Sequence, residues 1–309
     1  MEMELISKIE GLVAAPFTAM NRDGSLNLNT IEQQAEYLLE TGVRGAFICG
    51  TTGEGPSLTI DERMAIATRW MDVARKELKI IVHTGHNCVA DSKTLAAHAQ
   101  SIGAHATAAI APSFFKPASI ADLVDLCIEI AKSSPGLPFY YYNIPVLTGV
   151  NFPMAGFIAQ ARDRIPNFAG VKFTHENLMD YSQCIQMDDG RFDMLFGRDE
   201  ILLSALVVGA RGAVGSTYNY SAAIHRRVMH AFVEGDLEMA RKEQAYAVQS
   251  IDWLVKFGGL PAGKAIMQMI GIDCGPVRLP LKSLSQKSYA ELREGLDKMG
   301  FFEAIKPKR

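Results

Sequence analysis

Residues 168–174 read Phe168-Ala-Gly-Val-Lys-Phe-Thr174, an apolar run that contains one lysine. Runs that are almost wholly apolar are typical of strands buried on both faces, as in a parallel sheet covered by helices. The stretch therefore predicts a parallel α/β fold. It also raises the question of what Lys172 gains from a position inside a buried strand.

Seven further short runs rich in β-branched, aromatic or small apolar residues indicate additional strands, and helical patterns lie between them. Residues 59–76 begin with Thr59-Ile-Asp-Glu62, a capping-box pattern, and residues 91–102 and 119–133 repeat apolar residues at helical spacing. Eight strands that alternate with helices predict a closed (β/α)8 TIM barrel, with an open doubly wound sheet as the alternative. The seven runs are residues 11–17, 45–50, 80–84, 106–112, 138–145, 192–197 and 212–217.

The strand pattern stops after Tyr220, and only helical patterns follow. We expect a barrel over residues 1–233 and a C-terminal helical extension over residues 234–309. Because no linker separates them, the two parts should form one continuous unit. The expected helices span residues 224–233, 237–255, 263–270 and 288–299.

Composition excludes several classes of partner. The 309 residues carry a formal net charge of -3, and the last four residues, KPKR, form the only basic block. Neither nucleic acid nor an anionic membrane is therefore an expected partner. The first twenty residues include three glutamates and lack the pattern of a signal peptide. The most apolar long run, residues 201–215, is too short and too interrupted to span a bilayer.

The five cysteines are scattered and never have CxxC spacing. This usage favours a reducing compartment over a disulfide framework, so we expect a cytoplasmic location. All five are interpreted as small buried hydrophobic residues. They are Cys49, Cys88, Cys127, Cys184 and Cys274.

In a TIM barrel the reactive groups lie in the loops after the strands, which draws attention to Lys172. Burial should lower the pKa of this amine and leave a fraction of it neutral. A neutral amine attacks ketones to form a Schiff base, an electron sink that permits carbon–carbon cleavage. The alternative is a lysine that extends to solvent at the strand end, and position alone does not separate the two.

Tyr142 closes the tyrosine run of the fifth strand, next to the strand of Lys172 in a barrel. A phenol beside the amine would carry the proton that Schiff-base chemistry requires. Tyr140 and Tyr141 are interpreted as packing residues.

Two other loops carry hydroxyl, carboxylate and glycine groups. The stretch GTTGEG at residues 50–55 has the character of an anion-binding turn, although glycine-rich turns are often only turns. Gly197-Arg-Asp-Glu200 and Ser216 offer acceptors and a donor for a polyhydroxylated chain, or a solvated turn that caps a helix.

Two motifs are rejected as sites. Residues 258–264 match GxxxxGK, but Ala265 replaces the hydroxyl residue that holds magnesium, and a helix precedes the motif. His83, His86 and Cys88 have a spacing that a metal could use, yet only Asp91 adds a carboxylate. We therefore expect no metal site.

Four longer stretches together carry a specific resemblance, namely GTTGEGPSL, PFYYYNIPVLTGV, LFGRDEILLSALVVGARGAVGSTYNY and GLPAGKAIM. With them, almost the whole chain resembles the family of class I pyruvate-dependent aldolases that includes dihydrodipicolinate synthase and N-acetylneuraminate lyase. It is most similar to the N-acetylneuraminate lyase branch. The resemblance implies cleavage of sialic acid to pyruvate and N-acetylmannosamine, a barrel with C-terminal helices, a homotetramer, and no metal or organic cofactor.

The resemblance also implies roles for individual residues. Lys172 would be the Schiff-base lysine and Tyr142 the proton-transferring phenol. Thr51 and Thr52 would bind the pyruvate carboxylate. The hydroxylated tail of the sugar acid would contact Thr174, Gly197, Asp199, Glu200 and Ser216.

Two departures from the family pattern bear on the substrate. Synthases usually carry YNVPGRT, whose arginine binds a carboxylate, whereas this chain has Leu147 at that place. This favours a neutral aldehyde. Phe114 and Phe115 stand where many relatives have a tyrosine, and a phenylalanine cannot relay a proton. Alternatives are another pyruvate aldolase, acting on a 2-keto-3-deoxy sugar acid or aspartate semialdehyde, and a sugar-acid binding protein without turnover.

Overall fold

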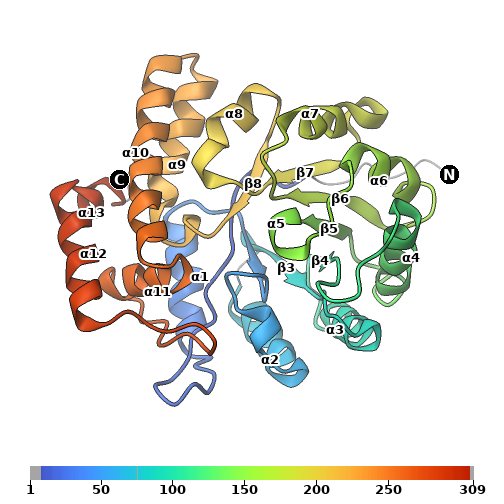
Figure 1. Ribbon diagram of the computed structural model, residues 1–309, viewed down its shortest axis with the longest axis horizontal. Helices are drawn as coiled ribbons and strands as arrows, with labels where there is room; N and C mark the ends of the chain where they lie inside the picture. Colours follow the sequence, from blue (N-terminus) through green and yellow to red (C-terminus); the bar gives the residue numbers. More distant parts are fainter. Residues whose placement is uncertain (1–7, 75, 307–309) are drawn as a thin grey trace.

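The computed structural model describes residues 8–74 and 76–306, and it contains a closed barrel of eight parallel strands in sequence order (Figure 1). Residues 1–7, at the start of the predicted barrel unit, lie outside the described residues. So do residues 307–309, at the end of the predicted extension, which are three of the four residues of the basic KPKR segment. Each predicted strand is present, and the TIM barrel is confirmed. The strands are β1 (Gly11–Ala14), β2 (Gly45–Ile48), β3 (Lys79–His83), β4 (Ala106–Ile110), β5 (Phe139–Asn143), β6 (Phe168–Phe173), β7 (Asp193–Phe196) and β8 (Gly212–Gly215).

Helices surround the barrel, and local capping sets where several of them begin. The Thr59 side chain accepts from the Glu62 N–H, and the Glu62 carboxylate accepts from the Thr59 N–H, so the predicted capping box is confirmed. The Ser119 side chain caps α4 by accepting from the Asp122 N–H, without the reciprocal bond. The surrounding helices are α1 (Thr30–Glu40), α2 (Ile60–Val73), α3 (Val89–Ser101), α4 (Ile120–Ala131), α5 (Pro145–Thr148), α6 (Met154–Ala161), α7 (Leu178–Gln186), α8 (Leu202–Val207) and α9 (Tyr218–Val233).

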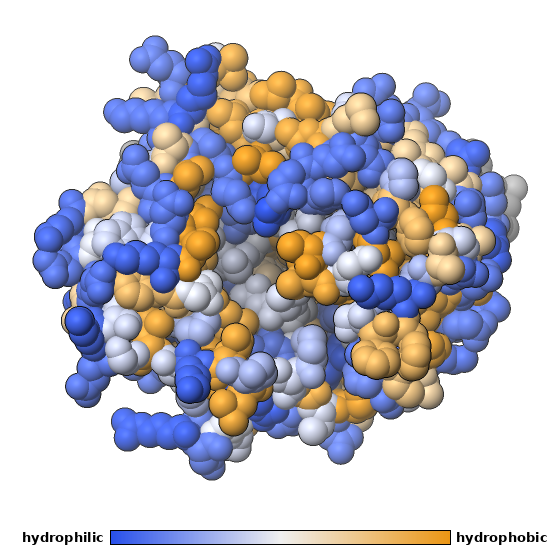
Figure 2. Space-filling view, viewed as in Figure 1, coloured by the Kyte–Doolittle hydropathy of each residue, from blue (hydrophilic) through white to orange (hydrophobic). Residues whose placement is uncertain are grey.

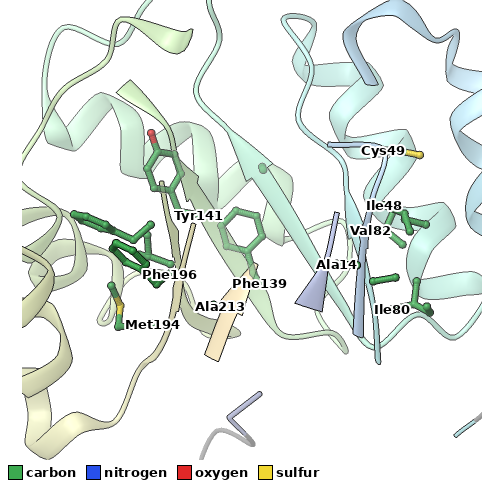
Figure 3. Packing of buried hydrophobic residues seen from close by; sticks show 14 of the residues in the cluster. Ala14, Ile48, Cys49, Ile80, Val82, Phe139, Tyr141, Met194, Phe196 and Ala213 are labelled. Atoms are coloured by element: carbon green, nitrogen blue, oxygen red, sulfur yellow. The ribbon is translucent and has the colours of Figure 1, made fainter. Parts of the chain in front are cut away.

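Side chains of the strands divide between the barrel interior and a layer beneath the helices. Ile48, Val82 and Tyr141 belong to the outer layer, part of which Figure 3 shows. Phe47 and Tyr142 belong to the interior cluster. Both sets are buried, which explains why the strands read as continuous apolar runs without polar alternation.

A buried polar contact closes the amino-terminal end of the barrel. The Asp193 carboxylate accepts from the Tyr140 hydroxyl at 2.8 Å and from the Ile9 N–H at 3.0 Å. Burial raises the pKa of Asp193 to about 6. Tyr140 is thus a packing residue of the barrel interior, and the opposite end of the barrel is the one left for chemistry.

The helices beyond residue 233 pack on one side of the barrel around a second core cluster (Figure 1). Phe17, Tyr220 and Ile224 contribute to this cluster from the barrel part of the chain. The boundary between residues 233 and 234 therefore stays a prediction. The helices are α10 (Leu237–Lys256), α11 (Leu260–Met269), α12 (Gln286–Lys298) and α13 (Phe301–Ala304).

Two further expectations concern membranes and cysteines. Within the described residues, no helix combines the length and the apolar character needed to cross a bilayer. All five cysteines are free thiols, and four are buried as predicted. The prediction is wrong for Cys88, which is exposed because it is the residue that precedes the first turn of α3.

Candidate active site

Lys172 lies in β6 near the carboxyl end of the barrel and is 4% exposed. Its Nζ lies 3.9 Å from the centre of the Phe47 ring and 4.0 Å from that of the Tyr142 ring. Burial lowers the pKa of the amine to about 7, while the charge of Asp199 opposes this shift. The side chain does not extend to solvent, so the geometry favours the reactive-amine interpretation over the alternative.

Tyr142 is the register partner of Lys172 across β5 and β6, as the strand order predicts. Its hydroxyl lies 3.4 Å from the Thr51 Oγ1. Burial raises the pKa of the phenol, and hydrogen bonding to Thr51 and Thr174 opposes the rise. An amine, a phenol and a loop hydroxyl therefore meet at one point inside the barrel mouth.

The GTTGEG turn, residues 50–55, follows β2 and has an unusual backbone. Cys49 and Glu54 both have left-handed φ values, 56° and 54°. A Cβ at Gly55 would lie 2.1 Å from the Cys49 carbonyl oxygen, so glycine is required there. Among the described residues, the N–H groups of Thr51 and Thr52 donate to no protein acceptor. With two hydroxyls beside them, these groups suit a carboxylate.

On the opposite side of the mouth, two glycines allow polar side chains to approach the backbone closely. A Cβ at Gly197 would lie 2.0 Å from the Thr174 Oγ1, and a Cβ at Gly215 would lie 1.9 Å from the Asp199 Oδ1. The buried Asp199 carboxylate accepts from the Thr217 N–H at 3.1 Å and its hydroxyl at 2.6 Å. The solvated-turn interpretation therefore fails for Asp199.

The remaining predicted residues lie nearer the rim. Glu200 follows Asp199 in the short helix η3 (Asp199–Ile201) and pairs with Arg198 at 3.4 Å. Ser216 is half-buried directly after β8. Figure 2 shows this face of the molecule hollowed near its centre, above the ring of strands.

Three residues at the site were not predicted. Phe47 supplies the apolar surface under the Lys172 amine. His83, considered as a metal ligand, is buried with its ring 5.9 Å from that of Tyr142; burial first, and then the charge of Arg63, holds its pKa well below the usual value. Gln244 of α10 donates to the carbonyls of Asp199 and Glu200 at 3.1 and 3.0 Å.

The two loops that differ from the family pattern are exposed. Phe114 and Phe115 are 77% and 84% exposed, and their rings contact each other at 4.9 Å. Leu147, in α5, is 54% exposed. Gly149 follows Leu147 by two residues, and the Lys116 amine lies against its backbone.

The two rejected motifs also have defined places. His86 and Asp91 approach to 3.4 Å, with the thiol of Cys88 nearby, but the His86 Nδ1 already accepts from the Cys88 N–H. The GxxxxGK segment contains the junction of α10 and α11, and its Lys264 is buried in an ion pair with Glu54. The arrangement around Lys264 is therefore not that of a nucleotide phosphate loop.

Comparison with known proteins gives one family. The model of the dihydrodipicolinate synthetase family matches residues 8–299. N-acetylneuraminate lyase A of Xenopus laevis is 46% identical over 280 residues, which are 89% of this chain and 92% of that protein. The structure of N-acetylneuraminate lyase from Aliivibrio salmonicida is 42% identical with a TM-score of 0.93, covering 96% of this chain and 98% of that one. The Proteus mirabilis enzyme is 38% identical, also with a TM-score of 0.93, covering 96% and 100%.

Proposed function

The chain belongs to the dihydrodipicolinate synthetase family, and we propose on that premise that it is a carbon–carbon lyase that cleaves N-acetylneuraminate to pyruvate and N-acetylmannosamine. The observation that carries the proposal is the buried amine of Lys172, whose pKa is about 7, in contact with the Tyr142 ring. An amine that is half neutral near neutral pH is suited to attack a ketone.

The first step joins the enzyme to the open-chain sugar acid. The neutral Lys172 amine attacks the ketone carbon C2, and loss of one water gives a protonated imine. The positive charge of the imine lies where the ammonium would be, beside the Phe47 and Tyr142 rings, whose faces attract cations. The imine withdraws electrons from C3 and prepares the C3–C4 bond for cleavage.

Tyr142 then carries the proton of the cleavage step. The phenol gives its own proton to the hydroxyl that leaves C2 as water when the imine forms. The resulting phenolate accepts the C4 hydroxyl proton, directly or through the substrate carboxylate, as the C3–C4 bond breaks into an enamine and an aldehyde. A phenol with a raised pKa is protonated at rest, but the neighbouring imine cation stabilises its phenolate. Protonation of the enamine at C3 and addition of water release pyruvate and restore the amine.

The two sides of the mouth hold the ends of the substrate. Thr51 and Thr52 bind the carboxylate through N–H and hydroxyl groups of the GTTGEG turn. Thr174, Gly197, Asp199, Glu200 and Ser216 contact the hydroxylated tail.

Leu147 argues against a dicarboxylate product. Without an arginine at position 147, this loop lacks a planar, bidentate partner for a second carboxylate. Lys116 does bring a positive charge to Gly149, so this loop is not free of cations. Its compact ammonium on a flexible stem does not reproduce the fork of an arginine, and a neutral aldehyde is the better fit.

We also propose a homotetramer in the cytoplasm. Phe114, Phe115 and Val146 are large apolar side chains exposed beside the barrel mouth, a surface that a second copy of the chain would cover. Five free cysteines agree with a reducing compartment. The proposed chemistry uses side chains and water alone, and we expect no metal or cofactor requirement.

The test combines product analysis with trapping of the imine. The purified protein is supplied with N-acetylneuraminate, and pyruvate and N-acetylmannosamine are measured; separately, intact mass is recorded after pyruvate and borohydride. We expect equal amounts of the two products and one reduced pyruvyl group per chain. Lys172→Ala should abolish both results. The exposed strand lysine provides a control, since Lys79→Ala should leave both unchanged.

The outcomes separate the alternatives. Trapping without cleavage of N-acetylneuraminate, but with turnover of another aldehyde and pyruvate, would assign a different aldolase of the family. Tight binding of the sugar acid without trapping or product would favour a binding protein. Cleavage at the wild-type rate by Lys172→Ala would refute the Schiff-base mechanism itself.

A further inference from the structure

A buried ion pair joins the GTTGEG turn to the C-terminal extension. The Lys264 Nζ in α11 lies 2.7 Å from the Glu54 Oε1, with only 3% and 2% of the two side chains exposed. The same amine donates to the Pro276 carbonyl at 2.6 Å. Burying two charges costs free energy that their attraction only partly offsets, so the pair adds little net stability. We therefore interpret it as a contact that fixes the position of the turn relative to α11.

The segment that follows α11 holds the turn at further points. The Arg278 N–H donates to the Glu54 Oε2 at 2.8 Å, so both oxygens of Glu54 are held by the extension. The Arg278 guanidinium donates to both carboxylate oxygens of Glu62 and to the Ser57 carbonyl at 2.9 Å. Residues from the turn to the start of α2 are therefore fixed from outside the barrel.

Glu54 is the residue through which this restraint reaches the ligand-binding groups. Its left-handed backbone is disfavoured for a residue with a Cβ and persists only where surrounding contacts impose it. Its N–H donates to the Thr51 carbonyl at 3.0 Å. The position of the Glu54 side chain is thus coupled directly to the peptide groups of Thr51 and Thr52.

We propose that Lys264 and Arg278 are positioning residues for substrate: the Lys264 amine and the Arg278 backbone N–H hold Glu54, and through it the GTTGEG turn, in the shape that binds the carboxylate. The inference rests on the proposed function, because it takes Thr51 and Thr52 as the carboxylate-binding residues. It makes the C-terminal extension part of the machinery for pyruvate binding, although none of its side chains touches the ligand.

The GxxxxGK segment, residues 258–264, does not bind a nucleotide, and the contact with Glu54 gives it another role. Gly258 and Gly259 have positive φ values and end α10, and Pro261 lies in the first turn of α11. A Cβ at Gly263 would lie 2.3 Å from the Phe17 ring, so glycine lets α11 approach the barrel. The lysine at the end of the motif then reaches Glu54.

The experiment measures the pyruvate concentration that gives half-maximal borohydride trapping. Lys264→Met leaves the Glu54 carboxylate buried without its partner, and we expect this concentration to rise by about tenfold or more, which corresponds to one misplaced hydrogen-bonded contact. Trapping at saturating pyruvate should stay complete, because Lys172 is untouched. Glu54→Gln combined with Lys264→Met removes both charges and should recover part of the loss.

Arg227 of α9 is a matched control, because it pairs with Glu243 of the extension at 3.0 Å and donates to the Ala304 carbonyl. Arg227→Met should lower the Tm and leave the half-saturating concentration unchanged. If Lys264 had only a structural role, Lys264→Met would likewise lower the Tm and leave the half-saturating concentration unchanged.

The possible results divide cleanly. If Lys264→Met is folded and its half-saturating concentration equals that of the wild type, the positioning role is refuted. If Lys264→Met does not fold, the neutral double variant carries the same test. Arg278→Met keeps the N–H bond to Glu54 and tests only the guanidinium contacts with Ser57 and Glu62. If the wild-type protein itself forms no adduct, the proposed function fails and the positioning role fails with it.

Discussion

The pKa of Lys172 predicts the pH dependence of imine formation. With a pKa of about 7, half of the chains carry a neutral amine at pH 7, whereas an ordinary lysine with a pKa of 10.5 would be neutral in only about one chain in three thousand. The difference is about three orders of magnitude in reactive amine. Initial rates of adduct formation, at low pyruvate with cyanoborohydride, should rise from pH 5.5, pass half-maximum near pH 7 and level off by about pH 8 to 9.

The cause of this profile can be tested separately. The carboxylate of Asp199 favours the ammonium form of Lys172, so Asp199→Asn should move the half-maximum to lower pH. Asparagine keeps an oxygen for the Thr217 contacts, which limits structural damage. A half-maximum near pH 10 in the wild-type protein, or a shift to higher pH in the variant, would refute the reasoning from burial.

Three other changes probe the phenol, the barrel floor and the tail side. Tyr142→Phe should still form the pyruvate adduct but lose about 10²- to 10⁴-fold in the kcat of N-acetylneuraminate cleavage, and an undiminished kcat would remove its role. Burial raises the pKa of Asp193 to about 6, whereas in the unfolded chain the same carboxyl loses its proton near pH 4. The protonated carboxyl therefore favours the folded state at low pH, and this contribution to the free energy of unfolding is lost as the pH rises through 6. Asp193→Asn should therefore be more stable by about 1–3 kcal/mol at pH 8 in urea unfolding, with the difference vanishing toward pH 4. Gly215→Ala would place a Cβ 1.9 Å from the Asp199 Oδ1 and should lower kcat/KM for N-acetylneuraminate by about 100-fold, checked by steady-state kinetics.

The barrel was predictable from the sequence because its strands are buried on both faces. Runs such as residues 168–173 show no polar alternation, and the helical segments between them carry caps such as Thr59. Boundaries were less exact: α9 begins at Tyr218, six residues before the expected helix, because its first turn is polar and lies at the mouth. The short α13 was not expected at all.

The site could be predicted only in part. The pairing of Lys172 with Tyr142 could be predicted because the two strands are neighbours in the barrel, and the resemblance supplied the remaining candidate residues. Phe47 was missed because an apolar run does not reveal which residues point into the barrel. The contact between Glu54 and Lys264 depends on how a distant helix packs, and no local pattern reports that.

The closed floor of the barrel restricts the order in which molecules leave. Asp193 and Tyr140 fill the amino-terminal end, so substrate, water and products share one opening. In the proposed mechanism the pyruvyl group stays bonded to Lys172 until water reaches it, while the aldehyde is already free nearer the rim. We therefore expect sequential release, with N-acetylmannosamine first and pyruvate last. Added pyruvate should compete with N-acetylneuraminate for the empty enzyme, whereas added N-acetylmannosamine should recombine with the enamine and run the reaction backwards.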